Sequence, residues 1–230
     1  MQEKTPPSLS AYSRQKRLLE IGVISFGFVL LPVLQGFALH FVDPQALGRQ
    51  VNSPLASLNY VWQFLLLLYL LSSSMPRLLR NTRFWSFQPL NLLHGIALAL
   101  ILLTISLCLG QILPHPQIGA MPFKRPPVPI GYIPIVLTVV LAVFLEELLF
   151  RVYYIQRLLS LGATPLMALL IAVPLFAIGH QYQGLTGIIM AAILGTVLSL
   201  SWLKWRNYWI NSLGHLFYNL TVLFLALAQA

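Results

Sequence analysis

The sequence has little charge. Only 8% of its 230 residues are Asp, Glu, Lys or Arg, whereas 58% are hydrophobic. A soluble domain has about 25% charged residues, and a chain with a third of that fraction cannot cover a surface that faces water. The mean hydropathy of +0.80 points the same way. The composition therefore excludes a soluble enzyme and an intrinsically disordered protein.

Cysteine is almost absent. The only one, Cys108, has no partner for an intramolecular disulfide. Small secreted domains with small cores depend on several disulfides, so that class is excluded too. Because Cys108 lies in an apolar run, we expect it to act as a small hydrophobic side chain.

Acidic residues are scarce, and the net charge is positive. Five Asp and Glu stand against 14 Lys and Arg, which gives a net charge of +9 at pH 7. In a soluble protein such a charge would suggest nucleic-acid binding. Here the cations flank apolar segments, which is typical of topology signals in membrane proteins. No nucleic acid is expected among the partners.

Apolar segments fill most of the chain. A helix needs about 20 apolar residues to cross a bilayer, and seven segments qualify: 18–42, 55–74, 89–113, 131–156, 164–181, 185–203 and 207–229. The first is too long for the apolar part of a signal peptide, so we expect it to be retained. The sequence predicts an all-α, polytopic membrane helix bundle of about seven helices. Residues 1–17 form a basic arm, and residues 18–230 form one membrane domain.

The distribution of Lys and Arg predicts the orientation. With the N-terminus in the cytoplasm, the cytoplasmic segments hold eleven cations and the opposite face three, Arg49, Lys124 and Arg125. The eleven are Lys4, Arg14, Lys16, Arg17, Arg77, Arg80, Arg83, Arg151, Arg157, Lys204 and Arg206. This bias predicts a cytoplasmic N-terminus and a C-terminus outside. The basic arm is expected to contact anionic lipid at the headgroups.

Two adjacent glutamates interrupt the fourth apolar segment. An ionisable group at membrane depth costs about 2.5–3.5 kcal/mol on insertion scales, so such residues are by default functional or neutralised. Glu147 and Arg151 are four residues apart on one helical face, which predicts an internal ion pair. Glu146 points about 100° away and has no cation on its own face. A buried, unpaired carboxylate suits a general base.

Polar side chains on two later segments can converge with Glu146. His180 closes the fifth segment, and His215 and Asn219 lie four residues apart on one face of the seventh. A carboxylate, two imidazoles and an amide provide a base, a polarising partner and oxyanion donors. That set predicts hydrolysis of an acyl bond by an activated water. Each histidine alone would more often be a hydrogen-bonded core residue. His40, His94 and His115 are expected at helix ends, interfaces or loops.

Three short motifs resemble those of the CPBP family, the CAAX-protease and bacteriocin-processing (Abi) intramembrane peptidases. The family's E-E-x-x-x-R stands at Glu146–Arg151, its F-x-x-x-H at Phe176–His180 and its H-x-x-x-N at His215–Asn219. The motifs follow in order on successive apolar segments. The resemblance covers about residues 130–225, and the first three segments carry no matching motif.

The resemblance implies a role for each motif residue. Glu146, helped by His180, would activate a water; His215 and Asn219 would hold the oxyanion; and Glu147 and Arg151 would brace the helix. Related type II CAAX prenyl endopeptidases remove the last three residues of prenylated proteins. A membrane-embedded or lipidated peptide is therefore the expected substrate, and a membrane protein complex is a possible setting.

Three alternatives stay open from the sequence. Glu146, His180 and His215 could bind zinc instead, although the H-E-x-x-H helix of common zinc peptidases is absent and a site without metal is favoured. The chain could also be a catalytically silent scaffold or assembly factor that binds a membrane protein. A proton-coupled transporter is the weakest, because inverted repeats and paired broken helices are not evident.

Overall fold

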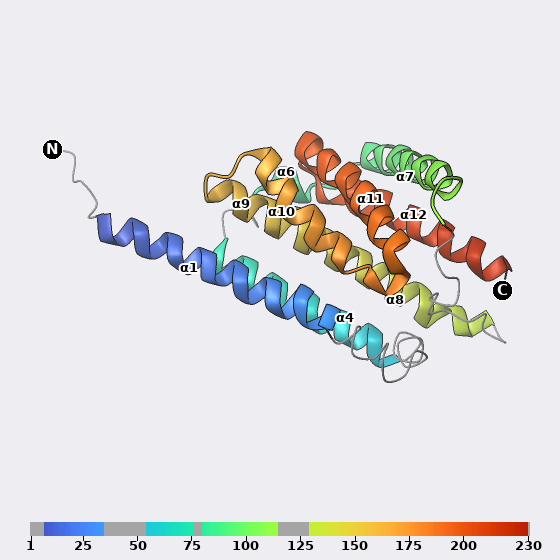
Figure 1. Ribbon diagram of the computed structural model, residues 1–230, viewed down its shortest axis with the longest axis horizontal. Helices are drawn as coiled ribbons and strands as arrows, with labels where there is room; N and C mark the ends of the chain where they lie inside the picture. Colours follow the sequence, from blue (N-terminus) through green and yellow to red (C-terminus); the bar gives the residue numbers. More distant parts are fainter. Residues whose placement is uncertain (1–6, 35–53, 76–79, 115–128, 230) are drawn as a thin grey trace.

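The computed structural model describes residues 7–34, 54–75, 80–114 and 129–229 (Figure 1). All regular elements in these ranges are helices, as the sequence predicts. Before the motif-bearing part they are α1 (Pro7–Ser25), η1 (Phe26–Leu30), α4 (Pro54–Ser74), α6 (Thr82–Trp85) and α7 (Pro89–Gly110). The later elements are η3 (Pro129–Gly131), α8 (Tyr132–Glu146), η4 (Glu147–Ile155), α9 (Gln156–Ser160), α10 (Pro165–Ile178), η5 (Gln181–Gln183), α11 (Gly184–Trp205) and α12 (Tyr208–Gln229).

Several helices are long and apolar enough to span a membrane. Five such stretches occur in the described residues: Arg14–Leu34, Pro89–Gly110, Pro129–Ser160, Gln181–Trp205 and Tyr208–Ala228. Two shorter apolar helices, Tyr60–Ser74 and Pro165–Ile178, complete the set. The seven agree with the seven predicted segments, and the all-α polytopic fold is confirmed. The protein is an integral, multi-pass membrane protein.

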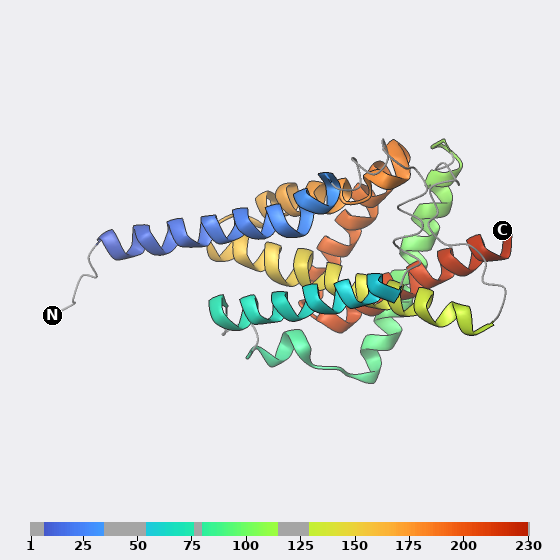
Figure 2. The same ribbon diagram turned by 90° about the horizontal axis from the view of Figure 1, so that it is seen from below.

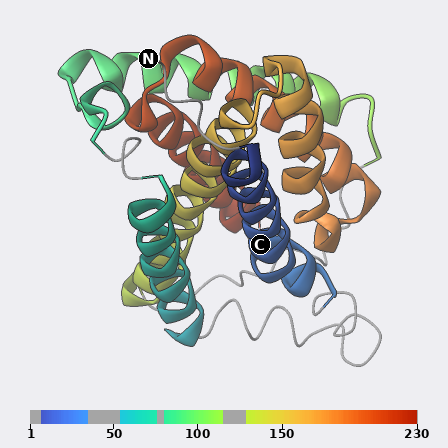
Figure 3. The same cartoon turned by 90° about the vertical axis from the view of Figure 1, so that its left-hand side faces the viewer.

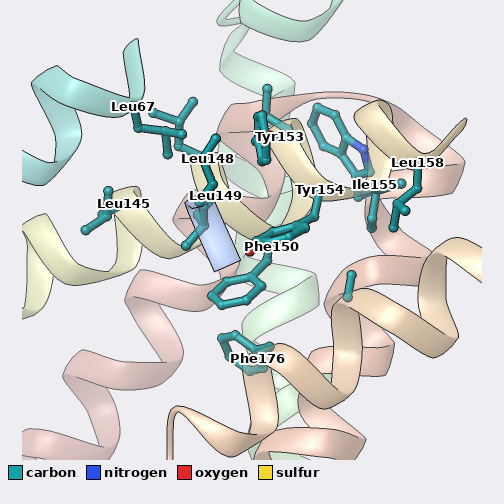
Figure 4. Packing of buried hydrophobic residues seen from close by; sticks show 14 of the residues in the cluster. Leu67, Leu145, Leu148, Leu149, Phe150, Tyr153, Tyr154, Ile155, Leu158 and Phe176 are labelled. Carbon is teal, nitrogen blue, oxygen red and sulfur yellow. The ribbon is translucent and has the colours of Figure 1, made fainter. Parts of the chain in front are cut away.

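One continuous helical rod, α8–η4–α9, forms the centre of the protein. Its middle part, η4, is a π-helix, and all nine of its residues are buried. α4, α10 and α12 pack against this rod. In Figure 4, Leu67 of α4 faces Leu148, and Phe176 of α10 faces Phe150. Glu147, the first residue of η4, is therefore enclosed by neighbouring helices, and Glu146 directly precedes it.

The other helices are arranged around this rod in different directions. α1 runs along it and extends past the rest of the bundle toward the N-terminus (Figure 1). Figure 2 shows that α7 runs across the direction of α1 and α4. Figure 3, seen from the N-terminal side, shows that α1 and α4 are separated from each other. α7 makes its main contact with α12, so α12 links α7 to the central rod.

The turn between α11 and α12 is fastened to the segment before α7. Arg206 adopts a left-handed conformation (φ 52°) that ends α11. Asn207 then caps α12, because its Oδ1 accepts a hydrogen bond from the Ile210 N–H at 3.1 Å. The Asn207 amide donates to the Ser86 carbonyl oxygen at 2.9 Å, and Trp209 Nε1 donates to the Trp85 carbonyl oxygen at 2.8 Å. These bonds set where α12 begins.

α7 and α12 approach closely at two glycines. A Cβ added to Gly95 would lie 2.9 Å from Leu213 Cβ, and one added to Gly214 would lie 2.7 Å from Leu98 Cδ2. Only glycine leaves room for this contact. Gly214 directly precedes His215, so the close approach also determines how deeply that histidine lies in the bundle.

A buried ion pair ties α1 to the central rod. Arg157 Nη2 lies 2.6 Å from Glu20 Oε1, with 3% of the Arg157 and 19% of the Glu20 side chain exposed. Tyr153 and Ser74 each donate a hydroxyl hydrogen bond of 3.0 Å to the same oxygen. Arg157 is therefore an interior residue rather than a cation in a cytoplasmic loop.

Two of the eleven cations counted for the predicted orientation are buried in the structure, so that count is corrected. Arg151 is only 1% exposed, and Arg157 is similarly buried. Both offset interior carboxylates and cannot act as surface signals. Removing these two from the eleven leaves nine cations against three, so the bias persists.

Loss of the Arg157 charge should destabilise the protein. Arg157→Ala leaves Glu20 with two hydroxyl donors but without its guanidinium partner. Breaking a buried pair costs about 3–5 kcal/mol, and the partial exposure of Glu20 puts the expected loss at the lower end. Thermal unfolding in detergent measures the change, with Lys16→Ala, which removes an exposed cation of α1, as the control. Equal melting temperatures for the two variants would contradict this expectation.

Candidate active site

His215 of α12 lies between the two adjacent glutamates of the central rod. Its Nδ1 is 2.9 Å from Glu147 Oε1, and its Nε2 is 3.9 Å from Glu146 Oε2. The helical spacing separates the glutamates by about 100°, and the imidazole reaches both because its two nitrogens lie on different edges of the ring. His215 therefore lies near Glu146, as the sequence suggested, and its contact with Glu147 is the part that the sequence did not reveal.

Glu147 is fully buried and has three polar partners. Arg151 Nε lies 3.4 Å from Glu147 Oε2, which is the ion pair expected from the spacing. The Asn211 amide donates to the same oxygen at 3.3 Å, while Oε1 faces His215. A buried carboxylate needs such compensation, because its desolvation cost is several kcal/mol. Glu147 thus does more than brace its own helix, since it also contacts the proposed catalytic histidine.

Glu146 is in a different environment, although it is the next residue. Its side chain is 30% exposed. Its Oε2 is buried and has no hydrogen-bond partner in the described part of the chain. A partly accessible carboxylate with an unused oxygen near an imidazole has the geometry of a general base.

Phe176 packs against both the ion pair and the histidines. The Arg151 guanidinium carbon lies 4.5 Å from the centre of the Phe176 ring. The same ring lies 4.7 Å from the His180 ring and 6.1 Å from the His215 ring, between centroids. A Cβ added to Gly195 of α11 would lie 2.7 Å from Phe176 Cδ1, so the glycine makes room for the ring.

His180 lies just after the end of α10. Its Nδ1 is 3.0 Å from the Phe176 carbonyl oxygen, which is left free at the helix end. The 14 residues of α10 span about 21 Å at 1.5 Å per residue, less than the bilayer core of about 30 Å. The helix continues through Pro174. After it, His180 and Gln183 of η5 line a cavity.

A cavity of about 200 Å³ has both histidines in its wall. The polar residues of the wall are Ser106, His180, Gln183, Thr186, His215 and Tyr218. Its apolar residues include Leu102, Met190, Leu194, Leu198 and Val222. α7, the third apolar helix, forms part of the wall through Leu102, Ser106 and Gly110, whereas α8 contributes none of the lining residues. The reason is the close packing of α7 on α12.

Asn219 and three further histidines were also considered in the sequence. Asn219 is half-buried on α12, one helical turn beyond His215, and no hydrogen bond of its side chain is found in the described ranges. His94 of α7 packs against Trp205, with 5.6 Å between ring centroids. His40 and His115 lie outside the described residues.

Sequence reasoning missed Asn211 and Ser201. Asn211 is fully buried and joins Glu147 to α11, where the Ser201 hydroxyl donates to its Oδ1 at 2.8 Å. A signal for Asn211 was present, because it precedes His215 by four residues and so shares its helical face. Ser201 carries no such signal, since only the packing of α11 on α12 brings it near.

Zinc binding by Glu146, His180 and His215 is the alternative that the sequence left open. Within the described ranges, no three His, Cys, Asp or Glu side chains gather closely enough to hold a metal ion. His215 Nδ1 is engaged by Glu147, which leaves only Nε2 for another partner.

Arg151→Ala should lower stability more than Glu146→Gln. The first change leaves Glu147 buried without its guanidinium partner, at a cost of about 3–5 kcal/mol. The second keeps the shape of a partly exposed side chain whose Oε2 has no hydrogen bond. Melting temperatures in detergent compare the two variants, and Arg151→Lys, which keeps the charge, should fall between Arg151→Ala and the unaltered protein. The expectation fails if Glu146→Gln is the less stable variant.

Comparison with known proteins identifies the family of this region. Residues 129–221 match the family described as Type II CAAX prenyl endopeptidase Rce1-like. No curated protein and no solved structure matches the chain. The matched residues run from η3 into α12 and contain all three motifs. This part of the chain is therefore similar to the CAAX-protease family that the three motifs resemble, and the match supports a protease kind of function.

Proposed function

We propose that the protein is an intramembrane endopeptidase in which Glu146 activates the attacking water. The substrate is a peptide bond of a membrane-associated protein or peptide, for which a lipidated chain is one candidate. One observation carries this proposal: Glu146, with an unpaired oxygen, lies 3.9 Å from a histidine whose other nitrogen is held by a second carboxylate. The family match supports the same kind of chemistry.

The gap between Glu146 and His215 suits a small reacting group. At 3.9 Å, Glu146 Oε2 and His215 Nε2 are too far apart for a direct hydrogen bond. A water lying beside the line between them can donate a hydrogen bond to each at normal length. In the proposed reaction Glu146 takes a proton from water, and the hydroxide attacks the peptide carbonyl. The C–N bond then breaks as Glu146 returns the proton to the amine.

The other motif residues would stabilise the intermediate. The Asn219 amide would donate to the oxyanion. Because the proton of the His215 ring lies on Nδ1, toward Glu147, its Nε2 would accept a hydrogen bond from the attacking water. His180 would help to orient the water from the cavity wall. Glu147 and Arg151 would keep His215 and the rod in place. No resident metal is part of this proposal.

The proposed orientation puts the N-terminus in the cytoplasm. Nine cations on that side against three, counted without the two interior arginines, support it through the positive-inside rule. Arg14 and Lys16 are exposed on α1. We propose that they contact anionic lipid headgroups.

Glu146→Gln should abolish hydrolysis and leave the fold intact, because a neutral amide cannot take a proton from water. The measurement compares the membrane peptidomes of cells that express the unaltered protein or the variant, and then follows cleavage of the peptides that differ with purified protein. Glu3→Gln, the same change in the N-terminal arm, is the control. Full activity of purified Glu146→Gln would overturn the mechanism.

The purified protein should show no dependence on zinc, either when it is treated with a chelator or in elemental analysis. Stoichiometric zinc that is lost on His215→Ala would favour a metallopeptidase.

Asn219→Leu separates a peptidase from a scaffold. The substitution keeps the volume but removes an amide donor, and the loss of one oxyanion donor costs about 10²–10³ in turnover. We expect the variant to melt like the unaltered protein, to retain any membrane-protein complex and to lose at least about 10²-fold in turnover. Co-purification and cleavage assays measure the two properties. If neither protein cleaves any membrane peptide and both form the complex equally, the chain is a scaffold.

A further inference from the structure

Asn211 uses every hydrogen-bonding atom of its side-chain amide inside the protein. It lies on α12, one turn before His215, and is fully buried. Its Nδ2 donates to the Leu198 carbonyl oxygen at 2.7 Å and to Glu147 Oε2 at 3.3 Å. Its Oδ1 accepts from the Ser201 hydroxyl at 2.8 Å. Asn211 therefore joins α11, α12 and the central rod.

These partners determine which way the amide faces. A backbone carbonyl and a carboxylate both accept hydrogen bonds, so both must lie on the NH₂ side of Asn211. A hydroxyl can donate, so Ser201 serves the carbonyl side. The reverse orientation would place an amide oxygen against two acceptors. Two of the three contacts come from α11, through Leu198 and Ser201, and they hold the amide against Glu147.

The orientation of Asn211 constrains Glu147 and, through it, His215. Asn211 and Arg151 both approach Glu147 Oε2, which leaves Oε1 to face His215 Nδ1 at 2.9 Å. An ionised carboxylate has no proton to donate, so Nδ1 is the donor in this bond. The ring is then held with Nε2 directed toward Glu146.

We propose that Asn211 is a positioning residue that holds Glu147 in the rotamer which keeps the proton of His215 on Nδ1 and directs Nε2 to the reaction centre. Asn211 contacts neither the cavity nor Glu146 and acts only through Glu147. Its catalytic consequence rests on the proposed peptidase function. Its effect on the histidine ring does not depend on that function and can be observed without a substrate.

The direct test is NMR of the protein labelled with ¹⁵N-histidine in detergent, with the His215 signals assigned by their loss in His215→Gln. The unaltered protein should show His215 with a proton on Nδ1. In Asn211→Leu and in the isosteric Asn211→Asp, we expect a shift of the His215 nitrogens toward a mixture of tautomers. Ser199→Ala is the matched control, because Ser199 is a buried residue of α11 whose hydroxyl bonds to the Gly195 carbonyl oxygen instead. Its His215 signals should not move.

Kinetics with a substrate found by the peptidome comparison provide the second readout. A positioning role predicts that Asn211→Leu lowers kcat and leaves KM nearly unchanged. The expected loss is about 10–100-fold, as for groups that orient metal-bound imidazoles. Ser201→Ala, which keeps the bond from Asn211 to Glu147, should lose less than Asn211→Leu. If Asn211→Leu does not fold, Asn211→Asp and Ser201→Ala decide the question.

The outcomes separate this proposal from the proposed function. Unchanged His215 signals in folded Asn211 variants would overturn the positioning role, whether or not the protein cleaves peptides. Shifted signals in a protein that cleaves nothing would support the positioning role and reject the peptidase. An equal fall in melting temperature and in kcat for Ser199→Ala and Asn211→Leu would show that Asn211 is only a packing residue.

Discussion

The burial of the Glu147 carboxylate is the constraint on which the rest of the site depends. A carboxylate without exposure to water must be compensated by charge and hydrogen bonds. Arg151 supplies the charge from the same helix, and His215 and Asn211 supply hydrogen bonds from α12. The same contacts that neutralise Glu147 therefore attach α12 to the central rod. They also orient the histidine that faces Glu146.

The change from α-helix to π-helix occurs between the two glutamates. Glu146 is the last residue of α8, and Glu147 is the first of η4. π-helical segments are rare and often occur at functional sites. In this protein all nine residues of the segment are buried. Two chemically identical neighbours thereby differ in access: Glu147 is sealed in the core, whereas Glu146 keeps 30% exposure.

Phe176 explains why an aromatic residue belongs to the second motif. Its ring covers the Arg151 guanidinium on one side and contacts both imidazoles. An aromatic face over a cation contributes attraction as well as exclusion of water. The ring fits only because Gly195 has no side chain at that position. The ring thus lies between the ion pair and the cavity that the histidines line.

Composition and local spacing were sufficient for the class of fold, the seven apolar helices and the Glu147–Arg151 pair. Hydrophobic length is a local property, and residues four apart on a helix meet without help from the rest of the chain. Contacts between helices carry no such local signal. The position of His215 between both glutamates, the network through Asn211 and Ser201, and the part of α7 in the cavity wall were decided by the tertiary structure. Each depends on how α12 packs on α7, on α11 and on the central rod. The interior location of Arg157 has the same origin, because its partner Glu20 is 137 positions away in the chain.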